Sequence, residues 1–140
     1  MAVPFANELF NEDPAGTFIQ GHIFICAPDL SSAQLERGVG YWHCDIAHGD
    51  RLTWSDQVYE LFDLPSGTPV ERSWAVTRYC EPSRDGLVKV RSYAIGRKLG
   101  FLLDAAIKSQ EADNRWIRVL AYPIIARGRV VGLHGMKRAL

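Results

Sequence analysis

The order of strand-like and helix-like segments constrains this chain more than any other feature. Period-two alternation over 40–45 and a second strand-like run over 51–54 predict a hairpin near the middle of the first half. A helix-rich stretch covers 55–99, and three more strand-like runs follow it, at 101–108, 115–125 and 129–136. Because hairpins lie on both sides of the helices, we expect an antiparallel sheet with the helices on one face, an α+β fold.

Three helices are predicted within the 55–99 stretch. Ser55 is a typical N-cap residue, and Pro65 ends the short helix that follows it. A second short helix is expected over 74–79. A long helix is expected over 82–99, because a proline is favoured in the first turn and a glycine follows the last residue.

Composition indicates one folded domain. The chain has 140 residues, of which 47% are hydrophobic and 23% are charged, and this balance excludes disordered and collagen-like classes. No apolar run approaches the roughly 20 residues of a membrane helix, and the N-terminus is acidic, unlike a signal peptide. We therefore expect a cytoplasmic protein with no membrane partner. Three cysteines without a CxxC pair indicate reduced thiols.

Charge is divided unevenly along the chain. Residues 1–70 hold ten acidic and two basic side chains, and residues 71–140 hold six acidic and fourteen basic ones, so the halves carry −8 and +8. We expect the halves to neutralise each other by packing together; separate acidic and basic faces are the alternative. The basic residues are spread over a helix and three strands rather than clustered, which argues against a nucleic-acid partner.

The first 30 residues differ from the rest, so we divide the chain into an N-terminal extension, 1–30, and a domain, 31–140. The extension contains the run FIQGHIFICA, which predicts a strand too apolar to remain in water, and a short helix is expected over 31–37. The strand 115–125 is apolar on both faces, so its outer face needs a cover. We expect the extension to dock there and help form a homodimer. The expected interface residues are Phe18, Ile23, Phe24, Ile25, Trp116, Leu120 and Tyr122.

Four segments, in this order, resemble a PAS domain of the subfamily with a Trp-rich first strand. They read G-V-G-Y-W-H-C-D, T-W-S-D-Q-V-Y-E-L-F-D-L, N-R-W-I-R-V-L-A-Y-P-I and R-V-V-G-L-H-G. The resemblance extends over about residues 30–136. It departs from the family at Cys80, where a histidine is usual, and at Ala106, where an arginine is common.

The resemblance implies a five-stranded antiparallel sheet in the order 2-1-5-4-3, with helices around a pocket. It also implies a non-catalytic role in sensing or association, as in bacterial two-component signalling, with an effector protein such as a kinase or cyclase as a possible partner. The segment R-Y-C-E-P-S lacks the Asn-Cys-Arg-Phe motif of flavin-binding members, and residues 83–99 contain no histidine for haem. The cofactor is therefore left unknown.

Candidate ligand-binding residues are those that the resemblance places toward the pocket. They are Trp42, Cys44, Tyr79, Tyr93 and Arg91. Aromatic walls with a few polar groups are typical of small-molecule sites. Arg91 also lies on one line of the long helix with Arg84 and Lys98. These cations either bind an anionic ligand or bury their stems and leave the charge in water, and the second reading is favoured.

Two further alternatives concern the chemistry of the chain. His43, Asp45, His48 and Asp50 are close in sequence and are of types that bind divalent metals, but we interpret them as a solvated hairpin. The motifs HExxH and GxSxG are absent, which argues against those enzyme classes. A ligand-binding sensor is the leading hypothesis. An association module whose cavity is filled by its own rings is the second, and a small enzyme is the least favoured.

Overall fold

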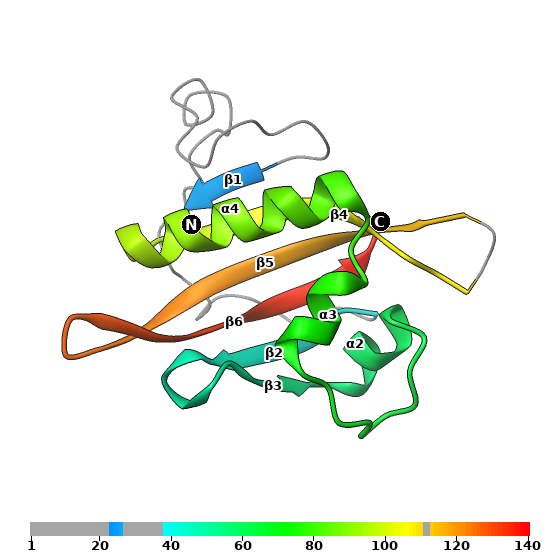
Figure 1. Cartoon of the computed structure of the whole chain (residues 1–140), viewed down its shortest axis with the longest axis horizontal. Coiled ribbons are helices and arrows are strands. Elements are labelled where there is room, and N and C mark those ends of the chain that lie inside the picture. Colours follow the sequence, from blue (N-terminus) through cyan, green and yellow to red (C-terminus); the bar gives the residue numbers. More distant parts are fainter. Residues whose placement is uncertain (1–22, 27–37, 111–112) are drawn as a thin grey trace.

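One antiparallel sheet organises the chain (Figure 1). The computed structural model describes residues 23–26, 38–110 and 113–140. Its strands are β1 (Ile23–Cys26), β2 (Gly40–Asp45), β3 (Arg51–Trp54), β4 (Gly100–Ile107), β5 (Arg115–Ala126) and β6 (Arg129–Ala139). They lie in the order β1-β4-β5-β6-β2-β3. Apart from β1 this is the predicted five-stranded order 2-1-5-4-3, which is confirmed.

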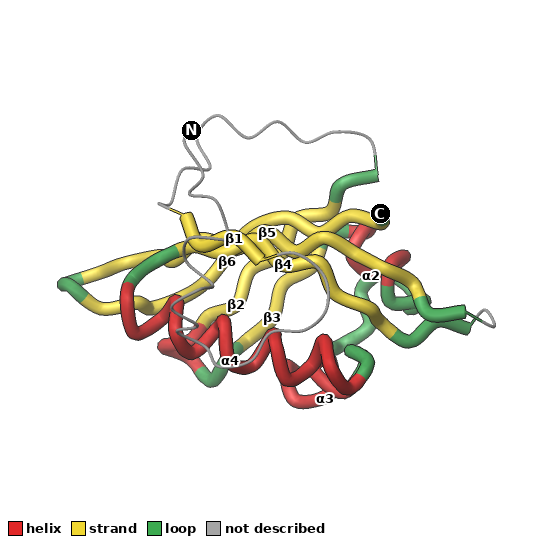
Figure 2. Tube along the Cα trace, turned by 90° about the horizontal axis from the view of Figure 1, so that it is seen from above, coloured by secondary structure: helices red, strands yellow, loops and turns green. Residues whose placement is uncertain are grey.

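The helices gather on one face of the sheet (Figure 2). They are η1 (Ile46–His48), α2 (Asp56–Leu61), α3 (Arg72–Thr77) and α4 (Glu81–Arg97). Ser55 is the N-cap residue of α2 as predicted, but its hydroxyl oxygen accepts a hydrogen bond from the Tyr41 amide, 2.8 Å away, and caps no helical N–H. Ser55 therefore fastens the start of α2 to β2. The helix α3 begins at Arg72, two residues before the predicted start.

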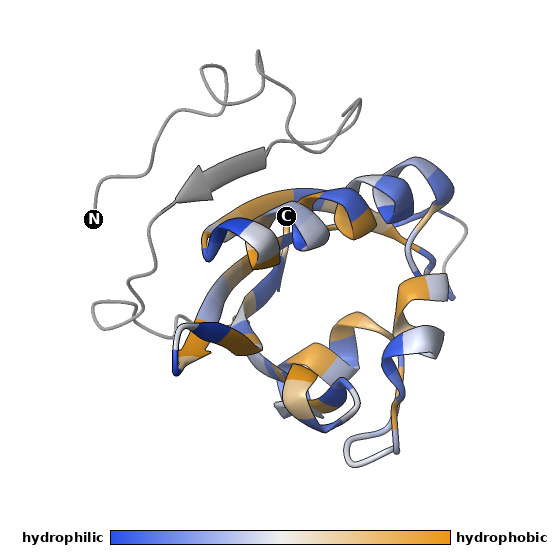
Figure 3. Cartoon of the chain, turned by 60° about the vertical axis from the view of Figure 1, so that its left-hand side comes forward, coloured by the Kyte–Doolittle hydropathy of each residue, from blue (hydrophilic) through white to orange (hydrophobic). Residues whose placement is uncertain are grey.

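Small residues let α4 approach the sheet. Its buried positions are Ser83, Gly86, Val90 and Ala94. The hydroxyl oxygen of Ser83 accepts a hydrogen bond of 2.9 Å from the Ala106 amide of β4, and this bond ties the helix to the strand. Hydrophilic and apolar stretches alternate along α4, in keeping with a helix that buries only a narrow face (Figure 3).

The N-terminal extension contributes β1 to the sheet. We expected its apolar run to form a strand across the outer face of the sheet. The strand is present over Ile23–Cys26, but its backbone pairs antiparallel with β4, with Ile23 opposite Leu103 and Cys26 opposite Gly100. β1 thus adds a strand at the edge of the sheet and does not lie across its outer face. Phe18 and the helix expected over 31–37 lie outside the described residues.

The expected interface residues of β5 differ in exposure. The Trp116 side chain is 38% exposed, and Leu120 is half-buried. Tyr122, in contrast, is only 1% exposed within this single chain. Among these three residues, Trp116 is therefore the best placed to contact another molecule.

Ion pairs join the acidic and basic halves of the sequence. Arg91 on α4 contacts Asp50 at 3.0 Å, and Arg115 on β5 contacts Asp63 at 3.4 Å. These contacts support the expectation that packing neutralises the charge split. The described residues contain no group of three or more His, Cys, Asp or Glu side chains arranged to bind a metal. Among the same residues, no helix has the length and apolar character needed to cross a membrane.

Gly135 on β6 lies where β5 leaves no room for a side chain. A Cβ atom at this position would collide with the carbonyl group of Leu120 on the neighbouring strand. We expect Gly135→Ala to lower the free energy of unfolding by about 3 kcal/mol or more, because the strands must separate. Urea denaturation provides the measurement. Gly96→Ala is the control: its Cβ would meet open space in α4, so it should stabilise by about 0.5–1 kcal/mol. Equal denaturation midpoints for the two variants would contradict this account of the strand contact.

Candidate functional site

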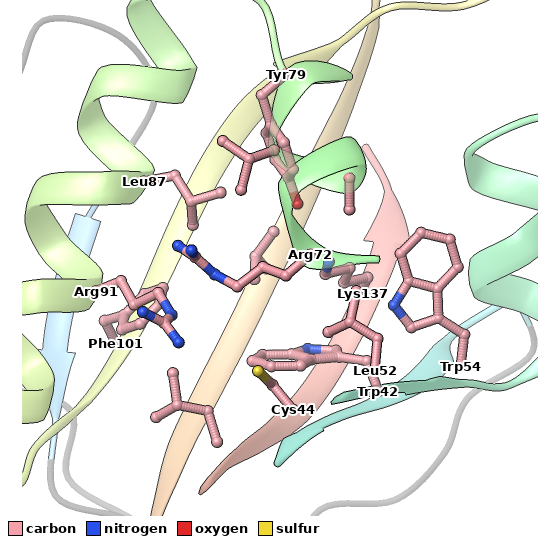
Figure 4. A pocket seen from close by; sticks show the side chains of 14 residues that line it. Trp42, Cys44, Leu52, Trp54, Arg72, Tyr79, Leu87, Arg91, Phe101 and Lys137 are labelled. Atoms are coloured by element: carbon pink, nitrogen blue, oxygen red, sulfur yellow. The ribbon is translucent and has the colours of Figure 1, made fainter. Parts of the chain in front are cut away.

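A cavity of about 60 Å³ lies between the inner face of the sheet and the helices α3 and α4 (Figure 4). Side chains from five strands and two helices surround it. They are Trp42, Cys44, Leu52, Trp54, Arg72, Ala75, Val76, Tyr79, Leu87, Arg91, Phe101, Val119, Leu133 and Lys137. The walls are mostly apolar, and the polar groups among them determine what the pocket can bind.

The structure brings four of the five predicted pocket residues together. Trp42 and Cys44 point inward from β2, and Tyr79 and Arg91 approach from the helical side (Figure 4). The period-two assignment of β2 thus placed the correct side chains on the inner face. Tyr93 does not line this cavity; its ring packs under the guanidinium of Arg97, with the centroid 5.0 Å from Cζ.

Lys137 is the central cation of the pocket, and it lies among aromatic rings. Its side chain extends inward from β6 and is only 8% exposed. The ammonium Nζ lies 5.2–5.8 Å from four ring centroids, those of Trp42, Trp54, Phe62 and Tyr79. No carboxylate of the described residues pairs with it. The rings offer cation–π attraction, but burial dominates and lowers the pKa of Lys137 to about 7.

Two further donors of the pocket have no partner in the described structure. They are the Tyr79 hydroxyl and the indole N–H of Trp54, both buried. Trp42 shows the usual arrangement, because its indole N–H donates to the Leu120 carbonyl at 3.2 Å. Burial raises the pKa of Tyr79, so its hydroxyl keeps its proton and remains a donor. Buried polar groups are normally satisfied, so these two donors are available to an acceptor that enters the cavity.

Arg72 and Arg91 place two more positive charges at the pocket (Figure 4). Arg91 is 17% exposed and donates from Nη2 to Asp50. Arg72 has no ion pair or hydrogen bond to a described residue. Burial, followed by repulsion from Arg91, lowers the pKa of Arg72. The attraction of Asp50 acts in the opposite direction, so the same carboxylate that pairs with Arg91 partly offsets the charge of Arg72.

Cys44 contributes a thiol that is protonated rather than nucleophilic. Burial is the largest influence and raises its pKa, although Arg91 acts in the opposite direction. Its Sγ lies 3.7 Å from Asp50 Oδ1, to which the thiol donates. A buried thiol with a raised pKa is a poor nucleophile. No catalytic role was predicted for Cys44 from the sequence.

Three polar lining residues were not predicted from the sequence: Trp54, Arg72 and Lys137. Alternation along β6 carries a signal for Lys137, since it continues the inward phase of Leu133 and Gly135. The other two cations on the predicted helix line do not reach the pocket. Arg84 donates to the Tyr79 carbonyl at 3.1 Å, and Lys98 ends α4 in the left-handed conformation.

Neither residue that departs from the family pattern lines the cavity. Cys80 and Ala106 are instead backbone partners, with the Cys80 amide donating to the Ala106 carbonyl at 2.9 Å. This bond fastens the start of α4 to β4. The two departures therefore lie at one helix–strand junction.

Comparison with known proteins finds similarity at the level of structure. No protein-family model matches the sequence, and no curated protein matches it significantly. An RNA-binding light-oxygen-voltage receptor superposes with a TM-score of 0.64 at 14% identity, over 73% of this chain and 29% of the receptor. This chain thus spans less than a third of that protein.

Two isolated domains superpose equally well. The N-terminal domain of a diguanylate cyclase with a PAS/PAC sensor, from Marinobacter aquaeolei, gives a TM-score of 0.64 at 16% identity, over 72% of this chain and 94% of that one. A domain assigned to a light and redox sensing histidine kinase from Haloarcula marismortui gives 0.63 at 14% identity, over 79% and 94%. With the strand order and the placement of the helices, these similarities show that the chain has the PAS fold.

Proposed function

We propose that this chain is a non-catalytic sensory module of the cytoplasm that binds a small molecule in the pocket and relays binding by association. The observation that carries the proposal is the pair of buried donors without a partner, the Tyr79 hydroxyl and the Trp54 indole N–H, on rings that surround the buried ammonium of Lys137. The structural neighbours include a sensor of a cyclase and a domain of a histidine kinase, so an effector of that kind is the proposed partner.

The pocket argues against a module that merely fills its cavity with its own rings. A self-filled core would leave neither about 60 Å³ of space nor buried donors without acceptors. Each unsatisfied buried donor costs about 1–3 kcal/mol, so the empty domain is less stable than a fully apolar core of the same shape would be. A ligand with matching acceptors would offset that cost.

The outer face of the sheet is the proposed route of association. Trp116 on β5 and Tyr41 on β2 are both more than a third exposed on that face, and the hydroxyl of Tyr41 contacts His134 Nδ1 at 3.0 Å. A homodimer would cover two such faces through one self-complementary patch, and residues 1–30 are proposed to contribute to it. Binding at the inner face would then reach the interface through a single layer of strands.

Lys137 predicts a dependence of stability on pH. Its folded pKa lies below the unfolded value, so the unfolded chain binds more protons between about pH 7 and pH 10.5 and stability rises with pH across that window. Lys137→Met should remove this rise and should be more stable than the wild type by several kcal/mol below pH 7, at about 1.36 kcal/mol per pKa unit. Urea denaturation at about pH 6 and about pH 9 measures it.

The comparison must isolate Lys137 from the other ionisable groups at the pocket, which are Cys44, Arg72, Tyr79 and Arg91. The difference between variant and wild type does so, because these groups are common to both. Lys89→Met, at an exposed lysine of α4, is the control and should leave the pH profile unchanged. A stability gain in Lys137→Met that does not vary with pH would show that the buried amine does not titrate as described.

Ligand binding is tested by native mass spectrometry of the purified chain and a thermal-shift screen of metabolites. We expect a co-purifying compound or a saturable rise in Tm, because a ligand of the native state stabilises it. Ala75→Val adds two methyl groups at the cavity wall and should abolish the shift, whereas Ala47→Val at an exposed position should not. Consistent absence of mass and shift would favour the association module.

Association is tested by light scattering on the full chain, a deletion of residues 1–28, Trp116→Glu and a control variant. We expect a dimer for the full chain and a monomer for Trp116→Glu, because the glutamate would place a charge in the proposed interface. Val88→Glu, at an exposed residue of α4 on the helical side, is the control and should stay dimeric. A deletion that remains dimeric and equally soluble would remove the extension from the interface.

A further inference from the structure

The unpartnered polar groups of the pocket are all hydrogen-bond donors. The protonated form of Lys137 can only donate, as can the indole N–H of Trp54, and the buried Tyr79 hydroxyl keeps its proton. Asp50 is the carboxylate that pairs with a cation of the pocket wall, and it accepts from Arg91. A ligand that satisfies this set must therefore present acceptors, and an ionised carboxylate is acceptor-only with two oxygens.

The charges lead to the same ligand class. Three cationic side chains line the cavity, and one of them is paired with Asp50. A neutral ligand would leave the buried ammonium of Lys137 without a counter-charge, and burial then favours its neutral form. A monoanion beside the Lys137 ammonium would supply the missing counter-charge. Its two oxygens could accept from the ammonium and from the Tyr79 hydroxyl or the Trp54 indole N–H, which belong to rings that surround Lys137.

The size and the walls of the cavity restrict the rest of the ligand. One water-sized group occupies about 10–15 Å³ by this measure, so about 60 Å³ accommodates about four to six non-hydrogen atoms. Apart from the polar groups, the walls are aromatic or aliphatic, with Leu52, Ala75, Val76, Leu87, Val119 and Leu133 as the aliphatic members. The remainder of the ligand is thus a short apolar chain.

We propose that the pocket binds a short-chain monocarboxylate, between acetate and butyrate in size, with its carboxylate held by the ammonium of Lys137 and by the Tyr79 hydroxyl and Trp54 indole N–H of the rings around it, and its alkyl chain against the aliphatic walls. The proposal rests on the proposed sensory function and names the ligand class for the same site. In this proposal Arg91 stays paired with Asp50 at one side of the pocket. Its positive charge therefore attracts the anion electrostatically without contacting it.

Calorimetric titration of the full chain with butyrate tests the chemistry of the ligand. Butyramide matches butyrate in size without the charge, and octanoate keeps the charge but exceeds the cavity. We expect saturable binding and a rise in Tm with butyrate, and at least tenfold weaker binding of the other two. Equal binding of butyramide would overturn the requirement for an anion, and equal binding of octanoate would overturn the size limit.

Variants test the assigned residues. Lys137→Met should weaken butyrate binding by about tenfold or more, the usual loss for a charged hydrogen bond, and Tyr79→Phe should weaken it by a smaller factor, since only a neutral donor is lost. Lys89→Met, outside the pocket, should bind as the wild type does, and the Tm of each variant without ligand shows that it is folded. Unchanged affinity in Lys137→Met would overturn the assignment. If the metabolite screen yields only a neutral ligand, the carboxylate proposal fails while the sensory function stands.

Discussion

The pairing of β6 with β2 is the constraint on which the rest of the structure depends. It joins the last strand of the chain to the first hairpin of the domain, with Lys137 opposite Gly40 and Leu133 opposite Cys44. This contact is non-local, so its loop-closure entropy must be overcome before it stabilises anything. Once formed, it places β6 in the middle of the sheet and brings the tryptophans of the hairpin over the Lys137 side chain. The pocket exists only after the two ends of the domain have met.

The pocket combines aromatic rings that hold one another in place with hydrogen-bond donors that have no partner among the described residues. Trp54 stacks on Phe62 at a centroid distance of 4.8 Å, and Phe62 meets the edge of Tyr79 at 6.0 Å, so the rings around Lys137 hold one another in place. Such aromatic pairs contribute about 0.5–1.5 kcal/mol beyond their burial. The Tyr79 hydroxyl and the Trp54 N–H, carried by these fixed rings, have no partner among the described residues. The domain therefore holds its unpaired donors in a defined geometry, which is the preorganisation that a small ligand requires.

The sequence predicted the fold better than the site, for physical reasons. Strand period, turn residues and helix signals are local, and they were sufficient for the order of elements and for the inward facing of Trp42 and Cys44. Lys137 was missed because a lysine in a terminal strand usually faces water, and its burial follows only from the β6–β2 pairing. Arg72 was missed because α3 begins two residues before the predicted start. The pairing of β1 with β4 was also missed, because it depends on a tertiary contact. From the sequence alone, an apolar run can either add a strand at the edge of a sheet or cover its face.

The position of Lys137 shows how the pocket and the outer face can act on each other. Along β6 the neighbours of Lys137 are Met136 and Arg138, which pair with Leu120 and Arg118 on β5. These residues border a shallow hollow of about 200 Å³ on the outer face, which Lys137 also borders. Arg118 in turn binds Asp104 through two hydrogen bonds of 2.7 and 2.9 Å, so side chains tie β5 to β4 next to this hollow. A change of charge balance at Lys137 thus acts on a strand that both faces share. In the proposed function the sheet itself is the shortest connection between ligand and partner, and no helix has to move for the two sites to be coupled.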